Sequence, residues 1–293
     1  DCATDSVIAH VRVGRDPERP ELNTRRRKLY VRNWDSESVS TIDIATLRVV
    51  KTLAMGNVPV CGYCCAAVDK YYCGAHNRVV VVCGAGDSVV AVIEPPAGLG
   101  PRAITGLGSD TLIAVAVGNG LGREEVWFVD TRADTVSAVV PVGTGEVFAL
   151  LYSAASGLLY AACYLDEVAV LSADGTGVRK KLRVGGLPEV MVAAPEYGYV
   201  YVAHWSGSWI FVIKDSVTGL EEPGPVAGWP SRVRASVTAG RLRVEAAGLL
   251  LDVSGRAVAR LEKGENDVRH LSPGVYFVRR QDSGESSRLV LAR

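Results

Sequence analysis

The 293-residue chain lacks three things: long hydrophobic runs, an excess of one charge, and any stretch with clear helical periodicity. No apolar run approaches the roughly 18 residues of a membrane-spanning helix, so we predict no transmembrane segment. Basic and acidic residues number 32 each, so the basic excess typical of nucleic-acid-binding proteins is missing and we predict no nucleic-acid partner. The absence of a 3.6-residue period argues against helical folds. No export signal is recognisable at the start of this numbering.

Valine is the residue that the chain has in abundance, with 46 copies. β-Branched side chains lose rotamer freedom in helices and fit the pleated surface of a sheet. The valine-rich runs are short and end at turn-forming residues, as Val79–Cys83 ends at Gly84. This pattern predicts an all-β fold.

An apolar triplet, usually with a tyrosine at its centre, recurs along the first 200 residues. Successive centres are 42, 41, 47 and 41 positions apart, at Tyr30, Tyr72, Ile113, Tyr160 and Tyr201. A glycine recurs in phase with it, at Gly14, Gly56, Gly98, Gly143 and Gly185. In four copies a proline comes three residues after that glycine, at Pro17, Pro59, Pro101 and Pro188. A period of 40 to 47 residues with several strands per repeat predicts a β-propeller of four-stranded blades.

Five blades are recognisable, and the fifth, at about 188–215, has three clear strands. Residues 1–8 align with residues 43–50 at an offset of 42, which predicts an outer fourth strand at about 6–13. If that strand completes the fifth blade, the ring closes with five blades and hides its edges. Otherwise, the five blades are part of a larger ring that has been truncated. Both readings place the propeller at residues 1–220.

The segments Tyr30–Asn33 and Ser38–Asp43 resemble the YVTN-type β-propeller repeat. The resemblance covers about residues 1–220. It implies a secreted or cell-surface protein, and it implies seven blades, so five is a departure from the family pattern.

A boundary follows the propeller at residues 221–230, which contain three prolines and two glycines. Residues 231–293 carry 12 basic and 7 acidic groups and no longer show the repeat. Their short alternating runs predict the strands of a small Ig-like β-sandwich, at 241–244, 249–253, 275–278 and 289–291.

This tail resembles the type A C-terminal sorting domain (Por) of the type IX secretion system. The resemblance rests on Leu251–Val258, Leu271–Arg279 and Arg288–Arg293. It implies an extracellular or outer-cell-surface location, with the secretion machinery as a partner of the tail. Four residues match hallmark positions of the family and are implied in recognition of the sorting signal: Gly255, Arg256, Gly274 and Tyr276. The alternative is a purely structural Ig-like cap.

Cysteines form the densest group of candidate ligands. Three of them lie between Cys61 and Cys65, followed by Cys73 and Cys83, with His76 nearby. Their spacing matches no standard zinc site. Strand alternation suggests packing between blades, where a thiol behaves as a small hydrophobic group. A disulfide and a metal site remain the alternatives.

Other candidate groups are scattered along the chain. The basic run Arg25–Lys28 is expected to lie in a solvated turn. His76 and His204 fall at nearly the same phase of the repeat and could face the channel or a blade rim. Four tryptophans are candidates for a ligand-binding face, with packing in a blade core as the alternative: Trp34, Trp127, Trp205 and Trp209.

We therefore predict a cell-surface module that binds or scaffolds an unidentified protein or polysaccharide, with affinity residing in its loops. No catalytic, cofactor-binding or metal-ligating residue is assigned, and no cofactor is implied. The alternative is a lactonase-like or dehydrogenase-like propeller enzyme with its site at the central channel. That alternative requires carboxylates to converge with histidines at one mouth, the candidates being Asp43, Asp87, Asp130 and Asp166.

Overall fold

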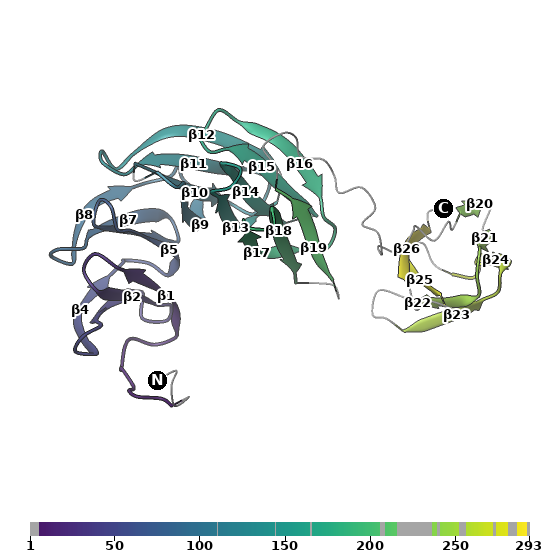
Figure 1. Ribbon diagram of the computed structural model, residues 1–293, viewed down its shortest axis with the longest axis horizontal. Coiled ribbons are helices and arrows are strands. Elements are labelled where there is room, and N and C mark those ends of the chain that lie inside the picture. The colour runs from purple at the N-terminus through teal and green to yellow at the C-terminus, as the bar shows by residue number, and fades with distance from the viewer. Residues whose placement is uncertain are drawn as a thin grey trace. The chain divides into compact units, whose positions relative to one another are not determined.

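The described part of the first 214 residues contains nineteen strands, which form five successive antiparallel sheets (Figure 1). A computed structural model of the chain describes residues 6–109, 111–143, 145–164, 166–205, 209–215, 236–238, 241–251, 256–271, 274–280 and 286–291. The chain divides into two compact units, residues 1–222 and residues 223–293. The first unit is the β-propeller, and each of its sheets is one blade.

Blades 1 to 4 each contain four strands in chain order, with the first strand innermost. Blade 1 consists of β1 (Pro17–Asn23), β2 (Lys28–Asn33), β3 (Ser38–Asp43) and β4 (Arg48–Ala54). Blade 2 consists of β5 (Pro59–Cys65), β6 (Lys70–Ala75), β7 (Arg78–Cys83) and β8 (Ser88–Ile93). Blade 3 consists of β9 (Gly100–Gly106), β10 (Leu112–Gly118), β11 (Glu124–Asp130) and β12 (Thr135–Gly143). Blade 4 consists of β13 (Val147–Ser153), β14 (Leu158–Cys163), β15 (Glu167–Ser172) and β16 (Val178–Arg183).

Blade 5 has three described strands, β17 (Pro188–Ala194), β18 (Tyr199–His204) and β19 (Ile210–Lys214). Residues 218–223, where a fourth strand of this blade would follow, lie outside the described residues. The strand expected at about 6–13 was wrong, because residues 6–13 carry no strand in the structure. Val7 and Ile8 are largely exposed there, so this segment lacks the buried face that helps to maintain a strand.

The repeated glycines and prolines have a local physical cause. Gly56 and Gly98 have φ values of 73° and 82°, which a residue without Cβ adopts without strain. Pro59 and Pro188 are the first residues of their inner strands, a position where the missing N–H removes no bond from the ladder. Blades 2, 3 and 5 thus enter their inner strands through a left-handed glycine followed by a proline.

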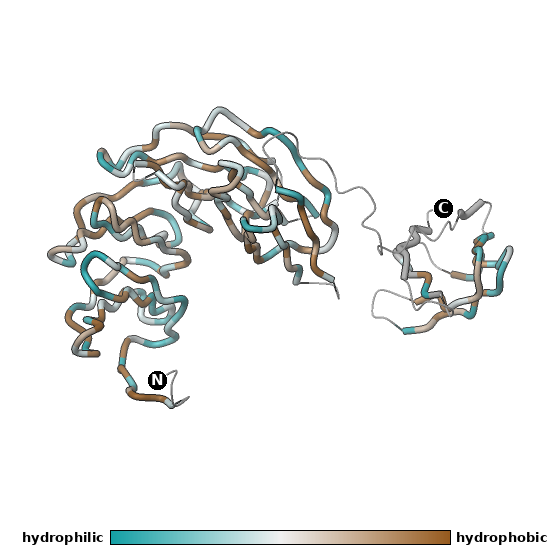
Figure 2. Tube along the Cα trace, in the orientation of Figure 1, coloured by the Kyte–Doolittle hydropathy of each residue, from teal (hydrophilic) through white to brown (hydrophobic). Residues whose placement is uncertain are grey.

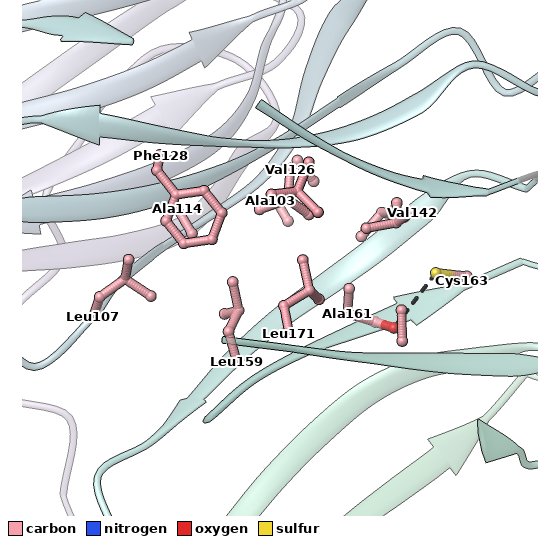
Figure 3. Close-up of a cluster of buried hydrophobic side chains, with 14 residues drawn as sticks. Ala103, Leu107, Ala114, Val126, Phe128, Val142, Leu159, Ala161, Cys163 and Leu171 are labelled. Atoms are coloured by element: carbon pink, nitrogen blue, oxygen red, sulfur yellow. Dashed lines mark hydrogen bonds between the residues drawn. The ribbon is translucent and has the colours of Figure 1, made fainter. Parts of the chain in front are cut away.

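Core side chains lie between neighbouring blades, and each seam between two blades has its own apolar cluster. Figure 3 shows the seam between blades 3 and 4, where Phe128 and Ala114 face Leu159 and Leu171. Figure 2 shows hydrophobic residues along much of the strand backbone and hydrophilic residues at many connections. Successive sheets therefore bury their facing sides against one another, as expected for a repeat protein.

In the described residues, a polar latch, in which a tyrosine hydroxyl donates to an aspartate of the next blade, crosses three of the four seams. The hydroxyl of Tyr30 and the ammonium of Lys28 both donate to Asp87 of blade 2, at 3.2 and 2.6 Å. In the same way, Tyr72 and Lys70 donate to Asp134 of blade 3, at 2.8 and 2.7 Å. The third latch joins Tyr160 to Asp215 at 2.7 Å, and Ser153 also donates to that carboxylate.

Alignment of the blades on the latch residues changes which residue of blade 3 is the centre of the apolar triplet. Lys28, Lys70 and Leu112 each open the second strand of their blade, so Ala114 occupies the place of Tyr30 and Tyr72. The sequence pattern predicted Ile113 at this position, which is one residue too early. Ile113 instead packs into the seam between blades 2 and 3. The aliphatic residues of β10 are so alike that their alternation does not reveal which face each one takes.

The described residues of the second unit form two sheets. One has the order β20 (Ser236–Thr238), β21 (Arg241–Val244), β24 (Gly264–Asp267). The other has the order β23 (Ala257–Leu261), β22 (Gly248–Leu251), β25 (Gly274–Arg280), β26 (Ser286–Leu291). Side chains of both sheets share one apolar cluster, centred on Leu242, Leu250 and Val278, as in a small β-sandwich.

Candidate functional site

Two repeated positions place side chains at one end of the blades, which we call the mouth face. The first is a β-bulge one residue into the inner strand. In blades 2 to 5 the ladder skips one residue each time, at Val60, Arg102, Phe148 and Glu189. A bulge re-aims its side chain away from the regular alternation, which is why bulges often lie beside binding sites.

The second repeated position follows the last residue of the second strand. Its N–H donates to the carbonyl just before the inner strand, as from Trp34 to Asp16 at 2.9 Å and from Tyr164 to Glu146 at 2.7 Å. The same bond recurs from His76 to Val58 at 3.0 Å and from Trp205 to Leu187 at 2.8 Å. One backbone device therefore presents a different side chain from each of these blades at the same mouth face.

An apolar pocket of about 300 Å³ forms where these two positions meet in blades 4 and 5. Its lining residues are Phe148, Tyr164, Leu187, Glu189 and Trp205. The rings of Phe148 and Tyr164 meet edge to face, with centroids 5.7 Å apart and an interplanar angle of 61°. Trp205 is 75% exposed. Apolar walls with few polar groups are the usual composition of a small-ligand site.

Charged groups occupy the mouth face of blades 3 and 4. Arg102 forms an ion pair with Glu146, with Nε and Oε1 3.0 Å apart. Glu124 is buried and accepts backbone N–H groups from Asn119 and Gly120 at 3.2 and 2.7 Å. Burial raises the pKa of Glu124, and the two N–H donors oppose that rise. This carboxylate holds the turn that follows β10.

The cysteines pack between blades, as strand alternation predicted. Cys61 and Cys65 lie on β5 and Cys73 on the adjacent β6, all buried. Burial raises the pKa of the Cys61 and Cys73 thiols to about 12. Cys61, Cys73 and Cys83 are thiols and not disulfides. No group of three or more metal-ligating side chains gathers anywhere in the described part of the chain.

The aspartates do not gather at one mouth. Asp43, Asp87 and Asp130 lie at the turns between third and fourth strands, whereas Asp166 lies between the second and third strands of blade 4. Asp43 accepts the Thr46 N–H at 2.8 Å, and such turn bonds lower the pKa of Asp43 and Asp130. These two carboxylates cap turns, so the convergence that the enzyme alternative requires is not present among these four side chains.

The two histidines expected at equivalent positions are one residue out of phase. His204 ends β18 and pairs with Pro188, whereas Ala75 makes the corresponding pair with Pro59. His76 is therefore the counterpart of Trp205. His76 is exposed, while His204 is half-buried and packs edge to face on Phe211.

The tryptophans separate into different environments. Trp34 and Trp205 both occupy the mouth face, as a ligand-binding surface would require. Trp127 is only 5% exposed and packs in the seam between blades 2 and 3, so it takes the blade-core alternative and does not lie on a binding face. Trp209 is exposed just before β19.

The basic run lies in the expected turn between β1 and β2, but its contacts extend to blade 2. Arg25 donates to the Ala67 carbonyl at 2.9 Å, and Arg26 bonds to Asp69 at 2.6 Å. The run therefore helps to join two blades as well as facing solvent.

The four sorting-signal residues remain a prediction. Gly255 lies outside the described residues. Arg256 is exposed just before β23, Gly274 opens β25, and Tyr276 lies on β25, packed against the cluster of the second unit. The described part of the chain contains no helix with the length and hydropathy to cross a bilayer.

Comparisons with known proteins support the fold. Neither a family model nor a curated protein sequence matches this chain. Among solved structures, hydrazine synthase of Kuenenia stuttgartiensis is similar, with a TM-score of 0.64 and 18% identity over 100% of this chain and 88% of that chain. A chain of the mitotic checkpoint complex has a TM-score of 0.55 and 13% identity over 64% of this chain and 58% of its own. At these identities the likeness shows the β-propeller fold alone.

Proposed function

We propose that the protein is a cell-surface binding module whose propeller holds a ligand at the mouth face. The observation that carries this proposal is the pocket between blades 4 and 5. Its aromatic residues come from two backbone positions that recur from blade to blade. The repeated backbone therefore places these side chains at the mouth face, while the packed seams hold the blades together. Exposed aromatic rings at a concave site are costly to leave in water and favour a bound partner.

The YVTN-like repeat and the sorting-domain resemblance supply the proposed location. In this proposal the second unit directs the chain through the type IX machinery to the outer surface, and the propeller then binds a protein or polysaccharide. The support is the sequence motif around Gly255, Gly274 and Tyr276, together with a compact β-sandwich unit that carries it.

A ligand screen tests the binding function. The full chain is applied to arrays of glycans, peptides and small metabolites beside its Trp205→Ala variant. We expect a ligand that the wild type retains unchanged and that the variant loses. Turnover of a bound compound, abolished by an Asp or His substitution, would instead establish an enzyme.

An export assay tests the location. The chain is expressed behind a signal peptide in a bacterium with a type IX system, with and without residues 231–293. We expect surface exposure of the full chain and periplasmic retention of the shortened one, read by protease accessibility on intact cells. A full chain with a substitution at Arg241, which lies outside the hallmark positions, serves as the control and should reach the surface. Equal surface exposure of both chains would contradict the proposal.

A further inference from the structure

The pocket between blades 4 and 5 has the construction of an aromatic cage. Phe148 and Tyr164 stand at 61° to one another, so they form two walls of a box and not one flat platform. Trp205 contributes a third aromatic side chain and Leu187 an aliphatic one. Aromatic rings carry negative charge on their faces and therefore attract a cation placed within about 6 Å.

The charge of the cage matches the same class of ligand. Glu189 is the single charged residue among the five that line the pocket. The neighbouring cation on the mouth face, Arg102, is already paired with Glu146 at 3.0 Å. A carboxylate beside three aromatic side chains adds a Coulombic attraction for a cation to that of the rings.

The scarcity of polar partners decides which cation fits. A primary ammonium brings three N–H donors that each need an acceptor, and a sugar ring brings several hydroxyl groups with the same need. Among the described residues that line the pocket, Glu189 is the only carboxylate. A fully methylated ammonium has no donor to satisfy, sheds its water at lower cost and covers the rings with methyl groups. We propose that this cage binds a trimethylammonium group, a proposal that rests on the binding function above.

Calorimetric titration of the full chain tests the ligand class. Choline and tetramethylammonium are compared with 3,3-dimethyl-1-butanol, the neutral isostere of choline in which carbon replaces nitrogen. We expect both cations to bind and the isostere to bind about tenfold more weakly or not at all. Equal binding of the isostere, or no binding of either cation, would overturn the proposal.

Matched variants locate the binding. Trp205→Ala should weaken choline binding by about tenfold, and Glu189→Gln should weaken it by a smaller factor. Trp34→Ala changes the corresponding position of blade 1 and should leave the affinity unaltered. Both tryptophans are exposed, so circular dichroism should show all three variants folded. An equal loss in Trp34→Ala and Trp205→Ala would place the binding elsewhere and refute the assignment.

Further titrations distinguish the possible sources of the trimethylammonium group. Choline, a trimethyllysine peptide and phosphatidylcholine vesicles present the same head in three settings, and vesicles that bind Trp205→Ala as well as wild type would count against the cage. If no trimethylammonium compound binds but the array yields another ligand lost in Trp205→Ala, the binding function stands and this inference falls. If neither experiment yields a ligand, both fall.

Discussion

The seam between blades 2 and 3 and the seam between blades 3 and 4 join the same kind of sheet by different chemistry. In the first, Tyr72 and Lys70 reach across to Asp134. In the second, Ala114 and Leu112 stand in the places of that tyrosine and lysine. In blade 3 the aromatic ring comes from the next strand, because Phe128 lies directly opposite Ala114 in the ladder.

At these ladder positions, the comparison indicates that side-chain volume is conserved while the polarity of the latch is not. Tyr72 faces Val81 in the ladder of blade 2, whereas Ala114 faces Phe128 in blade 3, so each pair contains one aromatic and one smaller residue. The turn between β15 and β16 of blade 4 has a glycine next to this ring. A Cβ at Gly175 would lie 3.1 Å from the Phe128 ring, so the glycine leaves room for it. Swaps that keep volume are tolerated best in packed interiors.

The largest expected effect breaks the apolar seam. Phe128→Ala removes a ring that is 1% exposed and should lower the free energy of unfolding by about 3–5 kcal/mol. Chemical denaturation measures the loss. Val139→Ala, on the neighbouring strand and 47% exposed, should change stability by less than about 0.5 kcal/mol. A loss below about 1 kcal/mol for Phe128→Ala would show that the seam collapses to fill the cavity.

An intermediate effect breaks the polar latch. Asp134→Asn weakens the partner of Tyr72 and Lys70. Because the Lys70 and Asp134 side chains are partly exposed, we expect a loss of about 1–3 kcal/mol. A double-mutant cycle with Tyr72→Phe isolates the coupling, expected at about 1 kcal/mol. The control is Asp174→Asn in the exposed turn of blade 4, where the Asp174 carboxylate bonds only within its own turn to Thr176. Additive losses in the cycle would mean that no latch exists.

A smaller effect uses pH to probe the buried thiols. Burial raises the pKa of Cys61 and Cys73 to about 12, so the folded protein keeps protons that the unfolded chain releases near pH 9. Stability from this source is complete below pH 9 and is lost as the pH rises toward 12. Denaturation at several pH values should therefore show a shallower decline in Cys61→Ala than in wild type. Identical slopes would contradict the shift.

Alkylation provides a separate test of the same burial. Iodoacetamide should modify the half-buried Cys83 before Cys61 and Cys73 in the native protein. Peptide mass spectrometry reads each site, and unfolding in urea should abolish the order. Early modification of Cys73 would mean that the seam between blades 1 and 2 opens under native conditions.

The smallest effect on stability is expected at the mouth face. Trp205 projects from a strand end and is 75% exposed, so Trp205→Ala should shift the thermal midpoint by less than Phe128→Ala shifts it. Thermal unfolding compares the two variants directly. A Trp205→Ala loss as large as that of Phe128→Ala would assign the ring to the core and remove it from the binding face.

Much of the fold was predictable because the repeat contains residues, such as glycine and proline, that have strict local backbone requirements. Glycine at φ values near 73° and proline at a strand start leave a periodic mark that needs no tertiary information. The candidate site was only half visible. Trp34 and Trp205 were recognisable as candidates, but Phe148 and Glu189 were not, because a bulge breaks the alternation that strand reading assumes.

Residue type and order alone established that this chain is all-β, that it repeats with a period near 42, and that a tail of different charge follows. These properties follow from backbone preferences, which act between neighbours in the chain. Pairing across seams is different in kind. Whether Tyr72 meets a carboxylate 62 residues away, and whether Phe148, Tyr164 and Trp205 surround one space, depends on how separate strands stack. Only the folded chain brings those groups within the few ångströms over which hydrogen bonds and dispersion act.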